Sequence, residues 1–89
     1  MENRINEKVQ YPIQFPIKVL GLNTHTLPSS IVGIIEKHAP DVVKTKPTIK
    51  VSKNRKYLSI TLEFTALSLA HLETIYSSLR EHPDVKTVL

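Results

Sequence analysis

Apolar residues along this chain follow two different periods, one typical of strands and one typical of helices. The clearest strand period covers residues 57–64, where every even-numbered position is apolar and the positions between them are mostly polar. A strand with this alternation buries one face and leaves the other open to solvent. We therefore expect four side chains of this strand to lie in the core: Leu58, Ile60, Leu62 and Phe64.

Three further strands are predicted from shorter patterns. Residues 15–21 alternate in the same way, a short strand contains Ile49 and Val51, and apolar residues near the end of the sequence predict a last strand from Val85. The polar run between the second and third strands predicts a tight hairpin turn, in which Asn54 adopts a positive φ.

Two segments between the strands have the spacing of amphipathic helices. The first begins near Thr26, carries Pro28 in its first turn and ends before Pro40. Gly33 lies inside this helix and costs about 1 kcal/mol relative to alanine, so we expect the helix to approach the sheet closely there. The second helix follows Ser68, which is placed to cap its N-terminus, and ends before a proline.

This order of elements predicts an α+β protein of ferredoxin-like architecture, βαββαβ. Right-handed crossovers place four antiparallel strands in one sheet with two helices on one face. Residues 1–10 lack periodicity and are predicted to form a flexible N-terminal arm, followed by a single domain over residues 11–89. The other face of the sheet should be open, and we expect it to be lined by Lys18, Leu20, Lys50, Tyr57, Ser59, Thr61 and Glu63.

Composition argues against several kinds of chemistry. The 89 residues include no cysteine, and the four histidines lack the spacing of a metal site, so we expect neither a metal nor another cofactor. His38 and His82 are expected in the last turns of the two helices, where a cation interacts well with the helix dipole. Serines occur without a Gly-x-Ser-x-Gly elbow. We therefore expect no catalytic residues and no enzyme activity.

The hydropathy of the chain bears on its location. No apolar run approaches the roughly 18 residues needed to cross a bilayer. The first eight residues are polar and mixed in charge, which is not typical of a signal peptide. The sequence therefore predicts a cytoplasmic protein without a membrane partner.

One stretch carries a family resemblance. Residues 11–21, YPIQFPIKVLG, resemble the opening of the YbeD-like family of small uncharacterised bacterial proteins, and further similarity lies in His38-Ala39-Pro40, in residues 72–76 and in Val88-Leu89. The resemblance implies a ferredoxin-like fold similar to that of regulatory ACT domains. It implies no activity, and it supplies no catalytic or ligand-binding residues.

Positive charge is concentrated in one segment. The net charge is +4, but no acidic residue occurs between Asp41 and Glu63, whereas six of the 12 basic residues do. We consider a solvated edge that discourages aggregation, a surface for an acidic protein partner, or a nucleic-acid surface. Nucleic acid is disfavoured, because Tyr57 is the only aromatic residue of the strand over residues 56–64 that is expected to face outward, and Glu63 would repel phosphate. The six residues are Lys44, Lys46, Lys50, Lys53, Arg55 and Lys56.

A second candidate site is the turn between the first strand and the first helix. The N–H groups at a helix start can receive a carboxylate or another anion. The turn lacks the Asp-x-Pro-Gly pattern common in amino-acid-binding ACT domains, so an ordinary connecting loop is the competing interpretation. The residues of this candidate ligand turn are Gly21, Asn23, Thr24, His25 and Thr26.

The sequence favours a noncatalytic regulatory or adaptor module that binds another protein, with a metabolic enzyme as one class of target. The alternatives are an ACT-like small-molecule sensor using the ligand turn, and weak nucleic-acid binding through the basic hairpin. The surface that would bind an acidic partner, or a second copy in a homo-oligomer, consists of Leu20, Lys50, Lys53, Arg55, Lys56 and Tyr57.

Overall fold

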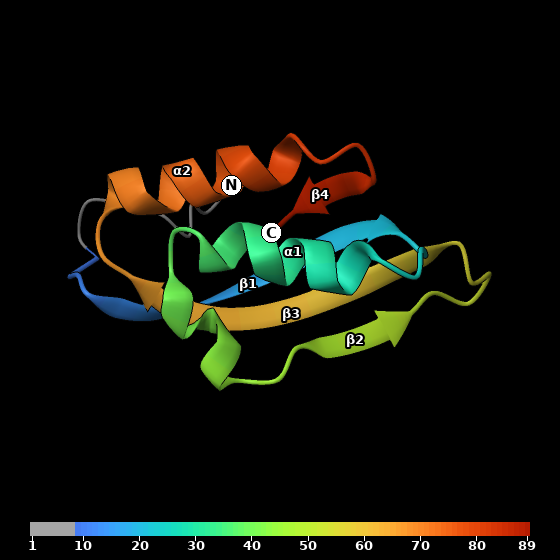
Figure 1. Ribbon diagram of the computed structural model, residues 1–89, viewed down its shortest axis with the longest axis horizontal. Coiled ribbons are helices and arrows are strands. Elements are labelled where there is room, and N and C mark those ends of the chain that lie inside the picture. Colours follow the sequence, from blue (N-terminus) through green and yellow to red (C-terminus); the bar gives the residue numbers. More distant parts are fainter. Residues whose placement is uncertain (1–8) are drawn as a thin grey trace.

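The computed structural model describes residues 9–89, and the strands in this range form one four-stranded antiparallel sheet. The strand order is β2-β3-β1-β4, and both helices lie on the same face, which confirms the predicted ferredoxin-like fold (Figure 1). The predicted N-terminal arm lies outside the described residues except for Val9 and Gln10. The elements are β1 (Ile13–Leu22), α1 (Leu27–Glu36), the 3-10 helix η1 (Pro40–Lys44), β2 (Thr48–Val51), β3 (Tyr57–Ala66), α2 (Leu69–Arg80) and β4 (Val85–Val88).

The core lies between the helices and the sheet. Its centre is the pairing of β1 with β3, in which Ile17 lies opposite Leu62 and Val19 opposite Ile60. All four even-numbered side chains predicted from the alternation of β3 are buried. Each such apolar side chain contributes about 1.5–3 kcal/mol when it is fully removed from water. The helices supply Leu27, Ile31, Ile35, Leu72, Ile75, Tyr76 and Leu79 to the same core.

The two glycines differ in a way that the sequence does not predict. A Cβ on Gly33 would meet nothing within 4 Å, so the expected close approach of α1 to the sheet at this position is wrong. The crowded position is Gly21 in β1, where a Cβ would lie 2.7 Å from the backbone oxygen of Asp84 and 2.7 Å from Cδ2 of Leu27. Only glycine allows this part of β1 to pass so close to α1 and to the residues before β4.

Strand β2 is an uncovered edge of the sheet. Its register places Ile49 opposite Ile60 and Val51 opposite Leu58, which puts both side chains on the helix side of the sheet. Even so, Ile49 is 45% exposed and Val51 is 50% exposed. The alternation in β2 therefore does not mark a buried face, because the two helices pack mainly over the other strands (Figure 1).

Candidate functional site

The basic hairpin turn joins β2 to β3, and its shape depends on Asn54 and Arg55. The residue with positive φ is Arg55, at 62°, so the prediction that Asn54 takes this conformation is wrong. Asn54 instead organises the turn through its side chain. Its Oδ1 accepts hydrogen bonds from the Ser52 hydroxyl at 2.8 Å and from the Lys56 N–H at 3.0 Å. The turn therefore has a fixed shape that presents its cationic side chains to solvent.

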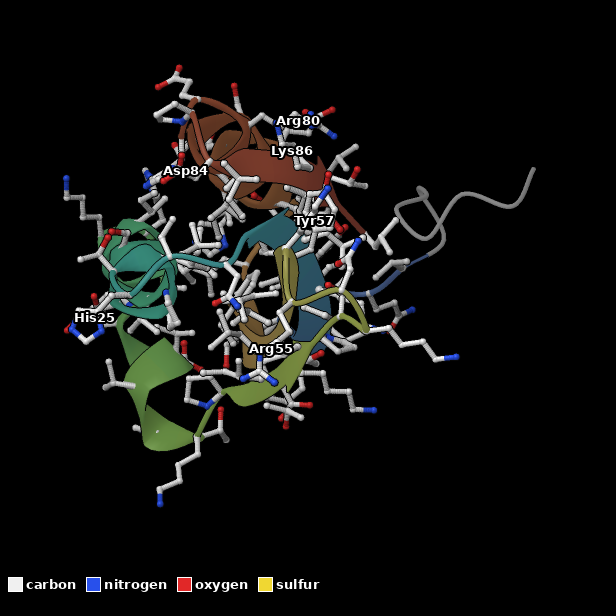
Figure 2. All side chains as sticks on the ribbon, turned by 90° about the vertical axis from the view of Figure 1, so that its right-hand side faces the viewer. His25, Arg55, Tyr57, Arg80, Asp84 and Lys86 are labelled. Atoms are coloured by element: carbon white, nitrogen blue, oxygen red, sulfur yellow. The ribbon has the colours of Figure 1, made fainter. Side chains whose placement is uncertain are left out.

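The candidate ligand turn is attached directly to this hairpin. The backbone N–H of Asn23 donates to the carbonyl of Lys56, and its side-chain amide donates to the carbonyl of Arg55, both at 2.9 Å. His25, Arg55 and Tyr57 consequently lie at the same end of the molecule (Figure 2). The two sites that the sequence treats separately are neighbours in space.

The remaining residues of the ligand turn differ in exposure. His25 and Thr26 are exposed, and Gly21 is buried. Thr26 occupies the N-cap position of α1 but makes no side-chain hydrogen bond to the helix, and the first turn of α1 contains no acidic residue. The hydroxyl of Thr24 is buried and has no hydrogen-bond partner within the part of the chain that the structure describes.

The predicted partner surface is continuous across three strands. Ser59 of β3 pairs with Leu20 of β1 on one side and with Lys50 of β2 on the other, so Leu20 and Lys50 share the open face of the sheet. Tyr57 lies two residues from Ser59 on the same face and is 41% exposed. The predicted residues Lys53, Arg55 and Lys56 extend this surface into the hairpin turn.

The positive charge of this region lies on the molecular surface. All six basic side chains of the acid-free segment are exposed. Among residues 9–89 none of the six has an ion-pair partner. Asp41 and Glu63 bound the segment, and Asp41 already binds Thr65. The cations are therefore free to interact with a negatively charged molecule.

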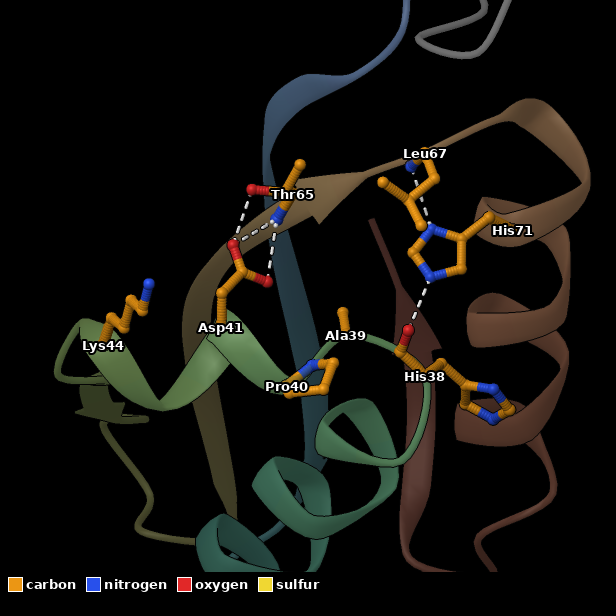
Figure 3. Close-up of a pocket in the computed structure, with 8 residues that line it drawn as sticks. All are labelled: His38, Ala39, Pro40, Asp41, Lys44, Thr65, Leu67 and His71. Carbon is orange, nitrogen blue, oxygen red and sulfur yellow. Dashed lines mark hydrogen bonds between the residues drawn. The ribbon is translucent and has the colours of Figure 1, made fainter.

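In a concave region lined mainly by residues of η1, β3 and α2, Asp41 and His71 have structural roles (Figure 3). Asp41 accepts from the Thr65 N–H at 2.9 Å and from the Thr65 hydroxyl at 2.6 Å. His71 accepts from the Leu67 N–H at Nδ1, 3.0 Å away, so its Nε2 is the nitrogen that donates to the His38 carbonyl at 2.7 Å. Both side chains hold backbone segments together.

Sequence reasoning missed Asp41 and His71, although each has a local signal. His71 follows the helix cap Ser68 by three residues, the spacing of a capping box, and the Ser68 hydroxyl accepts from the His71 N–H as predicted for a cap. Pro40-Asp41 is a sequence typical of a helix start, and it opens η1, which the sequence prediction left out.

His38 and His82 do not lie in the last helical turns as predicted. Each follows its helix by two residues, because α1 ends at Glu36 and α2 ends at Arg80. The Nδ1 atom of His82 accepts from the Asp84 N–H at 3.1 Å, and Nε2 of His38 lies 3.3 Å from the Ser78 hydroxyl. The His82 ring thus bonds the backbone two residues further along the chain, and the His38 ring contacts α2.

Among residues 9–89 no three potential ligand side chains are grouped in a way that could hold a metal ion. None of the helices described is both long and apolar enough to traverse a bilayer.

The geometry defines an α+β domain of the ferredoxin-like class that includes ACT domains. The crystal structure of the ACT domain from GTP pyrophosphokinase of Chlorobium tepidum has a TM-score of 0.62 and 20% identity, and covers 88% of this chain and 96% of that chain. Protein HP0495 from H. pylori has a TM-score of 0.71 and 16% identity, and covers 98% of this chain and 91% of that chain. At these identities the similarity establishes the fold.

The chain belongs to the family described as Protein of unknown function (DUF493), which matches residues 6–89. A UPF0250 protein from Shewanella amazonensis is 37% identical over all of this chain and 99% of its own length. The UPF0250 protein NE1487 from Nitrosomonas europaea is 35% identical over 91% of this chain and 93% of its own length. These relatives confirm the resemblance to the YbeD-like family of bacterial proteins.

Proposed function

We propose that this protein is a noncatalytic regulatory or adaptor module of the cytoplasm that acts by binding an acidic surface of another protein. The observation that carries the proposal is the combination of uncompensated cations with exposed apolar side chains on one edge of the sheet. Ile49 and Val51 are about half exposed, and exposed lysines surround them in the sequence. Apolar contact supplies affinity, and complementary charge increases the rate of association and the specificity.

Two further observations support a binding role rather than catalysis. The polar groups of the concave region beside η1 are engaged in hydrogen bonds that hold backbone segments, as shown for Asp41 and His71. The fold is also that of an ACT domain found in a GTP pyrophosphokinase. Fold similarity supports a regulatory class of function by analogy.

Affinity capture from native bacterial lysate with charge-reversal variants tests this proposal. Lys53→Glu combined with Lys56→Glu should abolish capture of the partner, because it replaces attraction by repulsion at the hairpin. Arg55 stays unchanged, since its positive φ would add a backbone effect. The matched control reverses Lys37 and Lys86, which are exposed but lie on α1's C-terminal side and on β4.

The control variant should capture the same proteins as the parent. Unfolding free energies of both variants should stay within about 0.5 kcal/mol of the parent, because exposed charges contribute little to stability. Equal capture by the two double variants would refute the proposed role of the hairpin. Capture of nucleic acid in place of protein, with a steep loss between low and physiological salt, would identify the alternative partner class.

A small-molecule sensor is the second candidate function. It is favoured by the buried Thr24 hydroxyl, which has no hydrogen-bond partner among residues 9–89 and lies near the uncapped N-terminus of α1. An amino acid or other small anion bound at the ligand turn should raise the melting temperature by mass action. A thermal-shift screen of carboxylate metabolites at millimolar concentration tests this, with Thr24→Val as the comparison. Absence of stabilisation would exclude the sensor function.

A further inference from the structure

We propose that β2 binds an acidic, extended segment of the partner as an additional antiparallel strand. The inference rests on the proposed binding function and specifies the chemistry of the partner and the mode of contact. The guest segment would alternate apolar and acidic residues. The backbone of β2, its side-chain pattern and its charge each support this arrangement.

The backbone hydrogen bonds show which groups of β2 face outward. Ser52 donates its N–H to the carbonyl of Tyr57 at 3.0 Å, so Ser52 faces β3. In an antiparallel ladder successive residues alternate between facing the neighbouring strand and facing away. The backbone N–H and C=O groups of Lys50 therefore point toward β3, whereas those of Ile49 and Val51 point to the open side of the strand. Within residues 9–89 these outward groups have no hydrogen-bond partner.

The protein protects part of the remaining edge of β3 itself. Beyond the end of β2, η1 lies beside β3. There the Asp41 carboxylate accepts a hydrogen bond from the Thr65 N–H, which would otherwise be free to pair with a longer β2. An exposed strand edge is a template for another strand, and on this side of the sheet β2 is such an edge. The open stretch, residues 49–51, offers two N–H and two C=O groups to a guest.

The side chains of β2 specify what the guest should look like. Ile49 and Val51 are exposed on the helix side of the sheet, so guest residues opposite them gain affinity if they are apolar. Lys50 is on the open face, and Lys46 and Lys53 flank the strand. Guest residues on that face are favoured if they are acidic.

The same charges disfavour a second copy of this chain as the occupant. Antiparallel pairing of two β2 strands that uses all the outward N–H and C=O groups of Ile49 and Val51 would place Ile49 opposite Val51 and Lys50 directly opposite Lys50. Like charges directly opposite each other destabilise a strand pair. An acidic segment reverses this interaction from repulsive to attractive, which is why we assign the edge to a different, acidic chain.

An NMR titration with a synthetic strand tests the inference. The probe is an eight-residue peptide of alternating valine and glutamate, acetylated and amidated, added to the ¹⁵N-labelled full chain. The largest shifts should occur in β2, and the Ile49 and Val51 N–H groups should exchange more slowly with solvent. Lys50→Glu should weaken binding about tenfold, equivalent to 1.4 kcal/mol, while Lys86→Glu on the opposite edge should leave it unchanged.

N-methylated peptides separate strand addition from simple charge attraction. Residues of the guest opposite Ile49 and Val51 are its valines, and their N–H groups point at β2. N-methylation of the valines should abolish binding, whereas N-methylation of the glutamates should preserve it. Equal binding of both peptides, no binding at millimolar concentration, or shifts centred outside β2 would overturn the inference. Concentration-dependent shifts of Ile49 and Val51 without peptide would identify a second copy and also overturn it.

The outcomes for the two proposals are distinguishable. If the peptide fails but the Lys53/Lys56 reversal still abolishes partner capture, the partner binds by another mode and the adaptor function stands. If the peptide fails and the Lys53/Lys56 reversal leaves partner capture unchanged, both proposals are wrong.

Discussion

Removal of the Asp41 carboxylate should destabilise this protein substantially, although Asp41 lies at the edge of the sheet. The carboxylate accepts hydrogen bonds from Thr65: the backbone N–H donates to both of its oxygens, and the hydroxyl donates to one of them. Asp41→Ala leaves both donors without this acceptor at a partly buried position. A hydrogen bond to a charged group contributes about 1.5–3 kcal/mol, and water can replace part of it here, so we expect a loss of about 2 kcal/mol.

The substitution Asp41→Asn separates charge from shape. The amide keeps one oxygen for the Thr65 N–H and offers an NH₂ group to the hydroxyl, so only the charge assistance is lost. Charge-assisted hydrogen bonds are about twice as strong as neutral ones, and Asn should therefore cost about half as much as Ala. Glu63→Ala is the matched control, because it removes an exposed carboxylate from β3, the strand that carries Thr65.

Urea denaturation followed by far-UV circular dichroism measures these differences. The urea midpoint should be highest for Glu63→Ala, lower for Asp41→Asn and lowest for Asp41→Ala, with unchanged m values. A loss of 2 kcal/mol corresponds to a melting temperature lower by about 8–16 °C for a domain of this size. If Asp41→Ala is no more destabilising than Glu63→Ala, the carboxylate does not protect the edge of β3 as argued.

Other substitutions test the core, the glycines and the histidine bridge. Leu62→Ala should cost about 2–5 kcal/mol in the same assay, because it opens a cavity in the centre of the core, and a parental stability would contradict that placement. Gly21→Ala should cost about 1–3 kcal/mol of stability by overpacking, whereas Gly33→Ala should stabilise the protein by about 0.5–1 kcal/mol. If the Gly21→Ala variant is the more stable of the two, the distances around the two positions are contradicted. His71→Ala should cost about 1–3 kcal/mol and accelerate hydrogen exchange at the Leu67 N–H, and an unchanged exchange rate would show that the ring does not bond it.

The fold was predictable where burial produces a regular pattern of apolar residues in the sequence. The alternation in β3 and the helical stripes identify the core because one side of each element is consistently apolar. The Ser68 cap was predictable for a similar reason, since its hydrogen bond is local. These signals together fix the order of elements, and the order limits the topology.

The errors have a common physical origin in tertiary contacts. Alternation in β2 resembles that in β3, but no local feature says how far the helices extend across the sheet, so the exposure of Ile49 and Val51 was not foreseen. The crowding at Gly21 comes from Asp84, which is remote in the sequence. Likewise, the contact of Asn23 with the hairpin joins two candidate sites that a linear chain keeps apart.

The placement of β1 between β3 and β4 governs how quickly this chain can reach its native state. Val19 pairs with Ile60 on one side and with Val88 on the other, so both ladders of the central strand require closure of long loops. Only β2 and β3 are joined by a short turn, and a hairpin of this kind forms within about 1–10 μs. Pairings between distant segments are slower, because loop entropy is lost before contacts compensate for it. The hairpin that carries the exposed edge is therefore expected to assemble before the sheet has its middle strand.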